Sequence, residues 1–234
     1  MNADKNTLNS ESFSSLPGVT HAVAVMDTLR SPGGCPWDAE QTHRTLVKYL
    51  LEETHELVEA IEDDDRINMR EELGDVLLQV LFHSRIAQEH PTDPFSFDDV
   101  AQDLAHKLEF RHPHVFGDVV AQDADEVAQN WAEAKQKEKG RESVFDGIPR
   151  GLGALARGQK IVSRASRDEL IVNALEVASE NVDNRSDAEK IGFELWDVVR
   201  RSARLGVDAE GALRQILTEI EGNARCAESE AANT

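Results

Sequence analysis

The sequence predicts an all-α protein, and three observations support that prediction. Apolar residues recur every three or four positions along most of the 234 residues, which is the period of one face of a helix. No segment shows the sustained apolar–polar alternation of a half-buried strand. The apolar content relies on Leu, Val, Ile and Ala, while aromatic residues make up only 5%, and this composition suits helices packed on helices.

Helix-breaking residues divide the first part of the chain into five predicted helices. A Ser-Pro-Gly-Gly run ends the first, three consecutive aspartates end the second, two prolines follow the third, and an Arg-His-Pro-His segment ends the fourth. The fifth helix is amphipathic and highly charged. The apolar stripes place these helices near residues 19–29, 42–61, 68–88, 97–110 and 123–139.

A glycine- and proline-containing stretch, residues 140–151, is predicted to link two domains. The first domain covers residues 17–139 and the second covers residues 152–226, with disordered tails at residues 1–16 and 227–234. The second domain is predicted to contain helices near residues 152–167, 169–181, 186–205 and 208–226.

A weak internal repeat relates the two domains. The segment EELGD at residues 71–75 can be laid over EKIGF at residues 189–193, and both segments continue into a helix. In this register Lys190 and Phe193 stand where the first copy has acidic residues. We therefore expect two tandem helical repeats, of which the second keeps its packing residues and has lost its charges.

The net charge of −20 is concentrated in the first part of the chain. Residues 1–150 carry a net charge of −16 and residues 151–234 carry −4. Such acidity argues against a nucleic acid polymer or an anionic membrane as a partner, and it favours the binding of cations. Two cysteines without a pairing framework, no signal peptide and no apolar run of 18 residues predict a cytoplasmic protein.

Two acidic pairs are the strongest functional signal. Glu53 and Glu56 lie three positions apart on one predicted helix, and Glu72 and Asp75 lie three apart on the next, so each pair shares a helix face. The short connection predicts an antiparallel hairpin that brings the pairs together. Four carboxylates there suit Mg²⁺, or Mn²⁺ as a substitute, with further ligands from substrate phosphates. Glu52, one residue off this face, could orient or deprotonate a water, so Glu52 and Glu53 are the candidate catalytic residues.

Three basic residues and one tryptophan are candidates for substrate binding. Lys107 and Arg111 lie four positions apart at a helix end, where they could hold phosphates or simply complement the helix dipole. Lys48 lies near the acidic pairs and could hold a phosphate or balance the acids. Trp37, in a loop that contains glycine and proline, could stack on a base or cover the core.

These residues stand in segments that resemble the MazG family of all-α nucleoside triphosphate pyrophosphohydrolases. The pattern EExxE, a spacer, then ExxD is shared, and so are GCPWD at residues 34–38, YLLEE at residues 49–53 and RHPHVF at residues 111–116. The resemblance implies a helical bundle of MazG type that converts a nucleoside triphosphate to the monophosphate and pyrophosphate with Mg²⁺. It also implies a homodimer with helices shared between subunits, a role in nucleotide-pool housecleaning, and a degenerate second MazG-like domain.

Two other functions stay open on the sequence alone. A non-catalytic helical regulatory or scaffold protein would carry the same acids as a solvated face and would release no pyrophosphate from nucleotides. A di-iron carboxylate bundle needs two ExxH motifs, which Glu52/His55 and Glu109/His112 formally provide. Because His112 precedes Pro113, it is biased away from helical geometry, and this disfavours the iron hypothesis.

Overall fold

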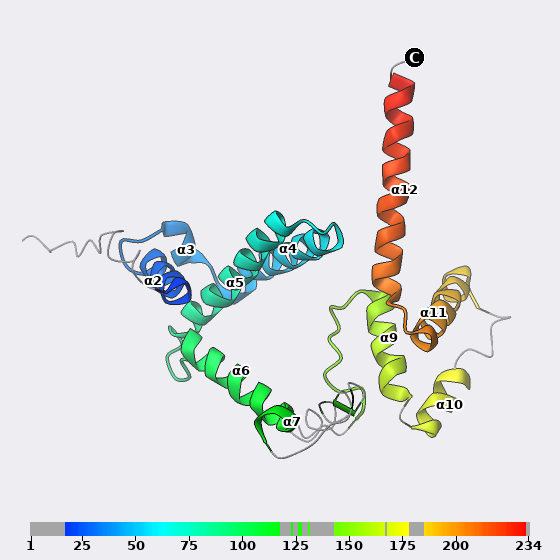
Figure 1. The fold of residues 1–234 in the computed structure, drawn as a ribbon, viewed down its shortest axis with the longest axis horizontal. Coiled ribbons are helices and arrows are strands. Elements are labelled where there is room, and N and C mark those ends of the chain that lie inside the picture. Colours follow the sequence, from blue (N-terminus) through cyan, green and yellow to red (C-terminus); the bar gives the residue numbers. More distant parts are fainter. Residues whose placement is uncertain are drawn as a thin grey trace, which may run out of the picture. The chain divides into compact units, whose positions relative to one another are not determined.

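The computed structural model describes residues 17–117, 123, 126–127, 131, 143–166, 168–177 and 185–232. Within these residues the regular secondary structure is helical throughout, which confirms the all-α prediction (Figure 1). None of the described helices combines the length and the low polarity that a membrane span needs. The chain divides into two compact units, residues 1–134 and residues 135–234, and each is described by itself.

The first four predicted helices are present in the first unit, each within about two residues of the expected bounds. Two short helices, α3 and α7, are not predicted by the apolar pattern. Both begin with proline, whose fixed φ suits the first position of a helix. In chain order the unit contains α2 (Gly18–Arg30), α3 (Pro36–Glu40), α4 (His43–Glu62), α5 (Arg66–Ala87), α6 (Phe97–Arg111) and α7 (Pro113–Phe116).

Side-chain caps fix the starts of the three helices that carry most of the candidate residues. Thr42 and Thr45 form a capping box at the start of α4, and Ser96 and Asp99 form another at the start of α6. The Asp65 carboxylate accepts hydrogen bonds from two backbone amides in the first turn of α5. Each cap satisfies amide groups that a helix start leaves unpaired. The aspartate run therefore ends α4 and also begins α5.

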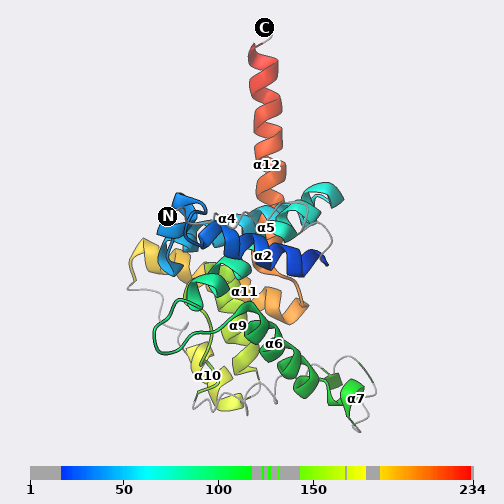
Figure 2. The same cartoon turned by 90° about the vertical axis from the view of Figure 1, so that its left-hand side faces the viewer.

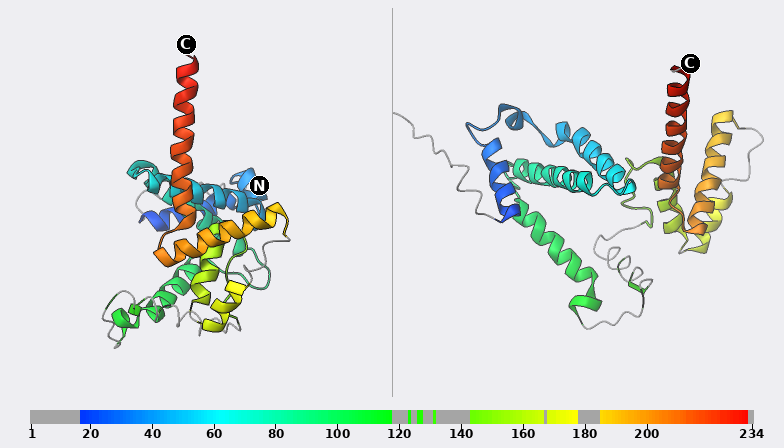
Figure 3. Two further views of the ribbon diagram at one scale, coloured as in Figure 1. Left: turned by 90° about the vertical axis from the view of Figure 1, so that its right-hand side faces the viewer. Right: turned by 45° about the horizontal axis from the view of Figure 1, so that its top comes forward.

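Helices α4 and α5 form the predicted antiparallel hairpin, and their interface is the most extensive between described helices (Figures 1 and 3). Asp64 adopts a left-handed conformation with φ of 54°, which lets the chain reverse within a few residues. The hydrophobic core contains Met26 of α2, Leu46 of α4, and Leu81 and Phe82 of α5. This core lies at the open end of the hairpin, where α4 begins and α5 ends. The stretch of the hairpin near the connecting turn contributes no residue to this cluster.

The second unit contains the predicted helices that follow the linker: α9 (Ala154–Ala165), α10 (Glu169–Val177), α11 (Asp187–Leu205) and α12 (Ala209–Ala232). The prediction of a disordered tail at residues 227–234 is wrong for residues 227–232, which continue α12 (Figure 2). Alanine and glutamate dominate this stretch, and both are strong helix formers that extend a helix without tertiary packing. The last helix is thus longer than its apolar stripe indicated.

Other predictions fall wholly or largely outside the described residues. The tail at residues 1–16 lies outside them, and so does most of the predicted helix at residues 123–139, of which residues 126–127 and 131 are helical. The linker predicted at residues 140–151 is described from residue 143 onward, where it forms turns and no helix.

Solvent exposure agrees at two positions of the predicted internal repeat. In the register that aligns residues 71–75 with residues 189–193, Leu73 matches Ile191 and Leu81 matches Val199. The residues of the first pair are 53% and 57% exposed. Those of the second pair are buried, with only 5% and 3% of their surface exposed. At these two positions, α5 and α11 place corresponding residues in similar environments, each within its own unit, whereas buried Ala87 corresponds to exposed Leu205.

Candidate metal centre

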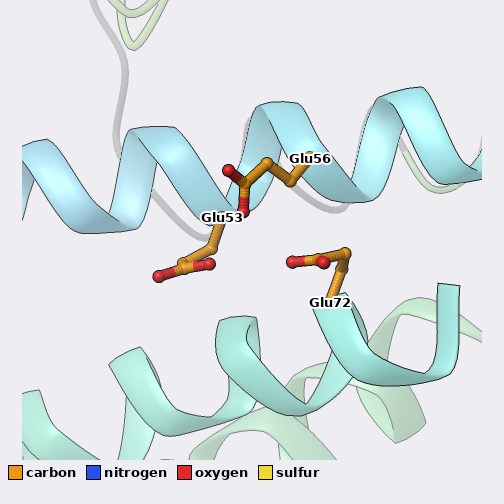
Figure 4. A group of neighbouring side chains, drawn as sticks. All are labelled: Glu53, Glu56 and Glu72. Atoms are coloured by element: carbon orange, nitrogen blue, oxygen red, sulfur yellow. The ribbon is translucent and has the colours of Figure 1, made fainter. Parts of the chain in front are cut away.

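Three glutamates from the α4–α5 hairpin converge on one point. Glu53 and Glu56 of α4 and Glu72 of α5 each offer a carboxylate oxygen, and these oxygens lie within 4.8 Å of one another. The side chains point into the space between the two helices (Figure 4). Because Glu53 and Glu56 are one helical turn apart, the hairpin alone is enough to assemble the group. The predicted meeting of the acidic helix faces is therefore present for three of the four residues.

The carboxylates perturb one another. Burial raises the pKa of Glu53 above its ordinary value, and the charges of Asp75, Glu56, Glu72 and Glu52 raise it further. Partial burial also raises the pKa of Glu72, and the neighbouring acids add to this shift. Asp75 is not one of the three converging residues, but its charge acts on both Glu53 and Glu72. A proton or a cation is thus favoured at this point.

The residues present fit a hard divalent cation. Glu72 Oε2 is buried, and no hydrogen-bond partner reaches it from the described part of the chain. A buried acceptor in this state costs free energy unless a donor or a cation occupies the space beside it. The group offers oxygen ligands alone, which is the preference of Mg²⁺ and Mn²⁺. Glu56 is exposed, so solvent can complete the coordination of such an ion.

Two further candidates lie on the same helix as Glu53. Glu52 is exposed and is not one of the three converging glutamates, so its role as an assisting acid or base stays a prediction. Lys48 precedes it by one turn, and the Lys48 ammonium lies 4.5 Å from the ring centroid of Tyr49. This cation–π contact holds the ammonium close to the helix surface.

Trp37 lies in the short helix α3 and is half exposed. Its ring makes edge-on contacts with Tyr49 at 5.9 Å and with Phe82 at 6.4 Å between centroids. Part of the indole therefore contacts the core at Phe82, while half of the residue stays exposed and is available to stack on a base. The two sequence-based hypotheses for Trp37 are compatible with this position.

The basic pair of α6 is not brought to the acidic group within the described part of the chain. Helix α6 leaves the open end of the hairpin and runs away from it (Figures 1 and 3). Lys107 is exposed near the far end of α6, and Arg111 is its last residue. Arg111 is buried, with its guanidinium 5.1 Å from the ring centroid of Trp131. The predicted helix-end position of the pair is present, but its proximity to the carboxylates is not.

Sequence reasoning missed a histidine pair. His43 at the start of α4 and His83 near the end of α5 approach with 2.7 Å between their Nδ1 atoms, and their ring planes are parallel within 1°. One Nδ1 must donate the shared proton and the other must accept it, so at least one ring is neutral. Burial and the nearby His43 both lower the pKa of His83. Forty residues separate the two histidines, so no local spacing could have revealed the pair.

The di-iron hypothesis finds no support in the geometry. Within the described residues, the group that could hold a metal contains glutamates and no histidine. His112 caps α6 with non-helical backbone angles, as the following proline predicts, and its Nδ1 lies 2.6 Å from the backbone oxygen of Leu108. His112 is therefore engaged in ending a helix.

Comparison with known proteins identifies the family of this chain. The model of the MazG nucleotide pyrophosphohydrolase domain matches residues 41–116. The nucleoside triphosphate pyrophosphohydrolase of Escherichia coli K12 is 37% identical over 226 residues, which cover 87% of this chain and 84% of that protein. The chain belongs to the MazG family. This membership makes it a nucleotide pyrophosphohydrolase, which is a hydrolase acting on acid anhydrides.

Other relatives differ in how much of their length is matched. An "Uncharacterized 26.1 kDa protein" of Streptomyces cacaoi is 46% identical over 202 residues, which cover 85% of this chain and 78% of that protein. The nucleoside triphosphate pyrophosphohydrolase of Mycobacterium tuberculosis is 42% identical over 207 residues, but these cover only 57% of its length. The MazG-domain match itself spans α4, α5 and α6, so it includes every candidate acidic residue and both cations of α6.

Proposed function

We propose that this chain hydrolyses nucleoside triphosphates to nucleoside monophosphates and pyrophosphate, with Mg²⁺ as cofactor and Mn²⁺ as a substitute. The convergence of Glu53, Glu56 and Glu72 within 4.8 Å is the observation that carries the proposal. Relatives with names for this activity cover most of the chain. A reaction on triphosphates needs a way to offset phosphate charge, and a divalent cation held by these carboxylates would supply it.

Four carboxylates have the proposed role of holding the ion: Glu53, Glu56 and Glu72 directly, with Asp75 completing the site. When bound, Mg²⁺ would neutralise phosphate charge and lower the pKa of an attacking water. Glu52, exposed beside this group, has the proposed role of orienting that water or accepting its proton. Lys48, one turn away, would contact a phosphate, and the free surface of Trp37 would stack on the base.

Lys107 and Arg111 have the proposed role of holding the departing pyrophosphate. Since α6 runs away from its own hairpin, we infer that these cations serve the acidic group of a second copy of the chain. Exposed apolar side chains on the helices concerned support such a homodimer, because water-exposed stripes of this kind mark interaction surfaces. They include Val47, Leu51, Leu73, Leu104 and Leu108.

The second unit is proposed to have no part in this chemistry. Lys190 and Phe193 replace the two acids of the repeat, and both have structural contacts of their own. Lys190 lies 3.9 Å from the carboxylate of Asp187, and Phe193 receives the guanidinium of Arg185 at 3.7 Å from its ring centroid. The positions that hold acids in α5 thus hold a surface ion pair and a cation–π contact in α11.

The cellular role that follows is housecleaning of the nucleotide pool, in the cytoplasm. Both cysteines, Cys35 and Cys226, are free thiols in the structure, as a reducing compartment favours. No nucleic acid polymer or membrane is proposed as a partner, because the surface charge is strongly acidic.

Product analysis tests the proposal. The full chain is incubated with Mg²⁺ and a panel of standard and damaged nucleoside triphosphates, and products are separated. We expect the monophosphate and pyrophosphate in equal amounts, with none formed in the presence of a chelator. Release of diphosphate and phosphate would contradict the reaction, and no turnover of any nucleotide would favour a non-catalytic scaffold.

A further inference from the structure

The second unit contains a largely apolar cavity that the proposed chemistry does not use. Its volume is about 180 Å³, and it lies between α9, α10 and α11. Val162 and Ala165 of α9, Val172 and Leu175 of α10, and Trp196 of α11 form its apolar wall. One turn before Val162, helices α9 and α11 are in close contact at Gly158, where an added Cβ would meet Val199 at 3.0 Å.

Two arginines stand at the edge of this apolar cavity. Trp196, Arg200 and Arg204 follow one another at intervals of four residues, so they lie along one face of α11 at steps of about 6 Å. The Arg200 side chain is 21% exposed and lies 3.5 Å from the carboxylate of Asp197. Arg204 is exposed, and its side chain has no ion pair or hydrogen bond with any described residue.

The internal repeat makes these arginines unexpected. In the register of that repeat, Arg200 corresponds to Phe82 and Arg204 to Ile86. Phe82 is part of the buried core of the first unit, and Ile86 packs against it. A repeat kept for packing alone would be expected to retain apolar side chains here, whereas an arginine places its stem against the cavity and keeps its charged head in reach of solvent. The dipole at the end of α11 accounts for Arg204 alone, because Arg200 lies a turn earlier.

We propose that this cavity is a second ligand site, which binds a phosphorylated molecule with a flat apolar part, as in a nucleoside monophosphate. The indole of Trp196 and the apolar wall would take the base. The guanidinium forks would take the phosphate at the rim. The volume is below the roughly 300–1,000 Å³ of pockets that enclose whole ligands, so the sugar and phosphate stay outside. The choice of nucleotide rests on the proposed function, whose product is a nucleoside monophosphate.

Calorimetric titration tests the site without any turnover. The full chain carrying Glu53→Gln and Glu72→Gln is titrated in chelator with AMP, GMP and, separately, inorganic pyrophosphate. We expect saturable binding of one monophosphate per chain, weakened at least about tenfold by adding Arg204→Ala and less by Arg204→Lys. Trp196→Leu is expected to weaken the monophosphate and to leave pyrophosphate unchanged. The matched control is Arg225→Ala, an exposed arginine on α12 that pairs with Glu221 one turn away.

The outcomes separate this site from the metal centre. If the wild-type chain released no pyrophosphate from triphosphates, the proposed function would be wrong. The titration involves no reaction, so its result does not depend on that assay. The second site is wrong if no monophosphate binds up to millimolar concentration, or if Arg111→Ala abolishes binding while Arg204→Ala does not. Equal weakening by Arg225→Ala and Arg204→Ala would also overturn it, because it would show a general charge effect. Circular dichroism of each variant confirms that the helices remain.

Discussion

Glu56 of α4 and Glu72 of α5 bring carboxylate oxygens within 4.8 Å of each other across the hairpin. The helices that carry them are joined by a run of three aspartates, so the approach depends on one tight turn and on the packing of α4 against α5. Like charges at this separation are unfavourable until a proton or a cation intervenes. The geometry that would hold a divalent ion therefore also destabilises the ion-free chain.

Removing one carboxylate should separate activity from stability. We expect Glu72→Gln to reduce turnover at least about a hundredfold while raising the unfolding temperature of the metal-free protein, since it deletes a repelling charge and keeps the shape. The matched control is Glu71→Gln, the exposed neighbour outside the converging group. Thermal melts in chelator and steady-state assays with Mg²⁺ measure the two effects. Wild-type activity in Glu72→Gln would show that the metal centre lies elsewhere.

The raised pKa values of Glu53 and Glu72 predict a pH dependence of the metal-free stability. Their pKa is raised on folding, so the folded state binds more protons than the unfolded state. Their contribution is fully present below the ordinary value of 4.5 and is lost as pH rises through the folded-state pKa. Urea unfolding at a series of pH values, with and without Mg²⁺, measures it. We expect Mg²⁺ to restore at high pH the stability that protonation supplies at low pH.

His83 predicts the opposite dependence at higher pH. Its pKa is lowered on folding, so the folded state prefers the neutral ring. The corresponding stability is present above the ordinary value of 6.5 and is lost as pH falls through the lowered pKa. We expect His83→Leu to flatten the loss of stability in acid below that value, as followed by urea unfolding. An unchanged profile in His83→Leu would mean that protonation of the pair with His43 does not matter to folding.

Mixing two inactive variants tests whether α6 serves the other subunit. In a dimer of one Glu72→Gln chain with one Arg111→Ala chain, sharing across subunits leaves one site with every residue intact. Statistical exchange should then recover about a quarter of wild-type activity. If Arg111 served the acidic group of its own chain, both sites of the mixed dimer would be defective and no activity would return. Size-exclusion chromatography confirms exchange.

The two glycines of the repeat offer a matched pair of substitutions. A Cβ added at Gly74 or at Gly192 meets nothing within 4 Å. We expect Gly192→Ala to keep activity and to stabilise the chain by up to about 1 kcal/mol, as alanine does in a helix interior. Gly74 lies between Glu72 and Asp75, where substrate or a second copy would approach, so Gly74→Ala should lower turnover at least about tenfold. Equal activity of the two variants would argue against such an approach.

Much of the fold and part of the site follow from local sequence. Helix starts at Thr42, Asp65 and Ser96 were predictable because capping chemistry is local, and the carboxylates of Glu53 and Glu72 could be paired because a short turn fixes a hairpin. The position of Arg111 relative to the acids was not predictable, since it depends on the direction of α6 and not on spacing. The extension of α12 to Ala232 was missed because helix propensity, without an apolar stripe, sustains it.

The matching exposures of Leu73 with Ile191 and of Leu81 with Val199 bear on how this protein tolerates change. If the outward face is covered in the assembled enzyme, substitutions there should be rejected as strongly in the second unit as in the first, although only one unit carries the acids. In a saturation mutagenesis screen, tolerance to substitution would then depend on the helix face of a position and not on its distance from the metal centre. The neutral positions would lie on the flanks of both helices, and a stabilising change found in one repeat would have a transferable counterpart 118 residues away in the other.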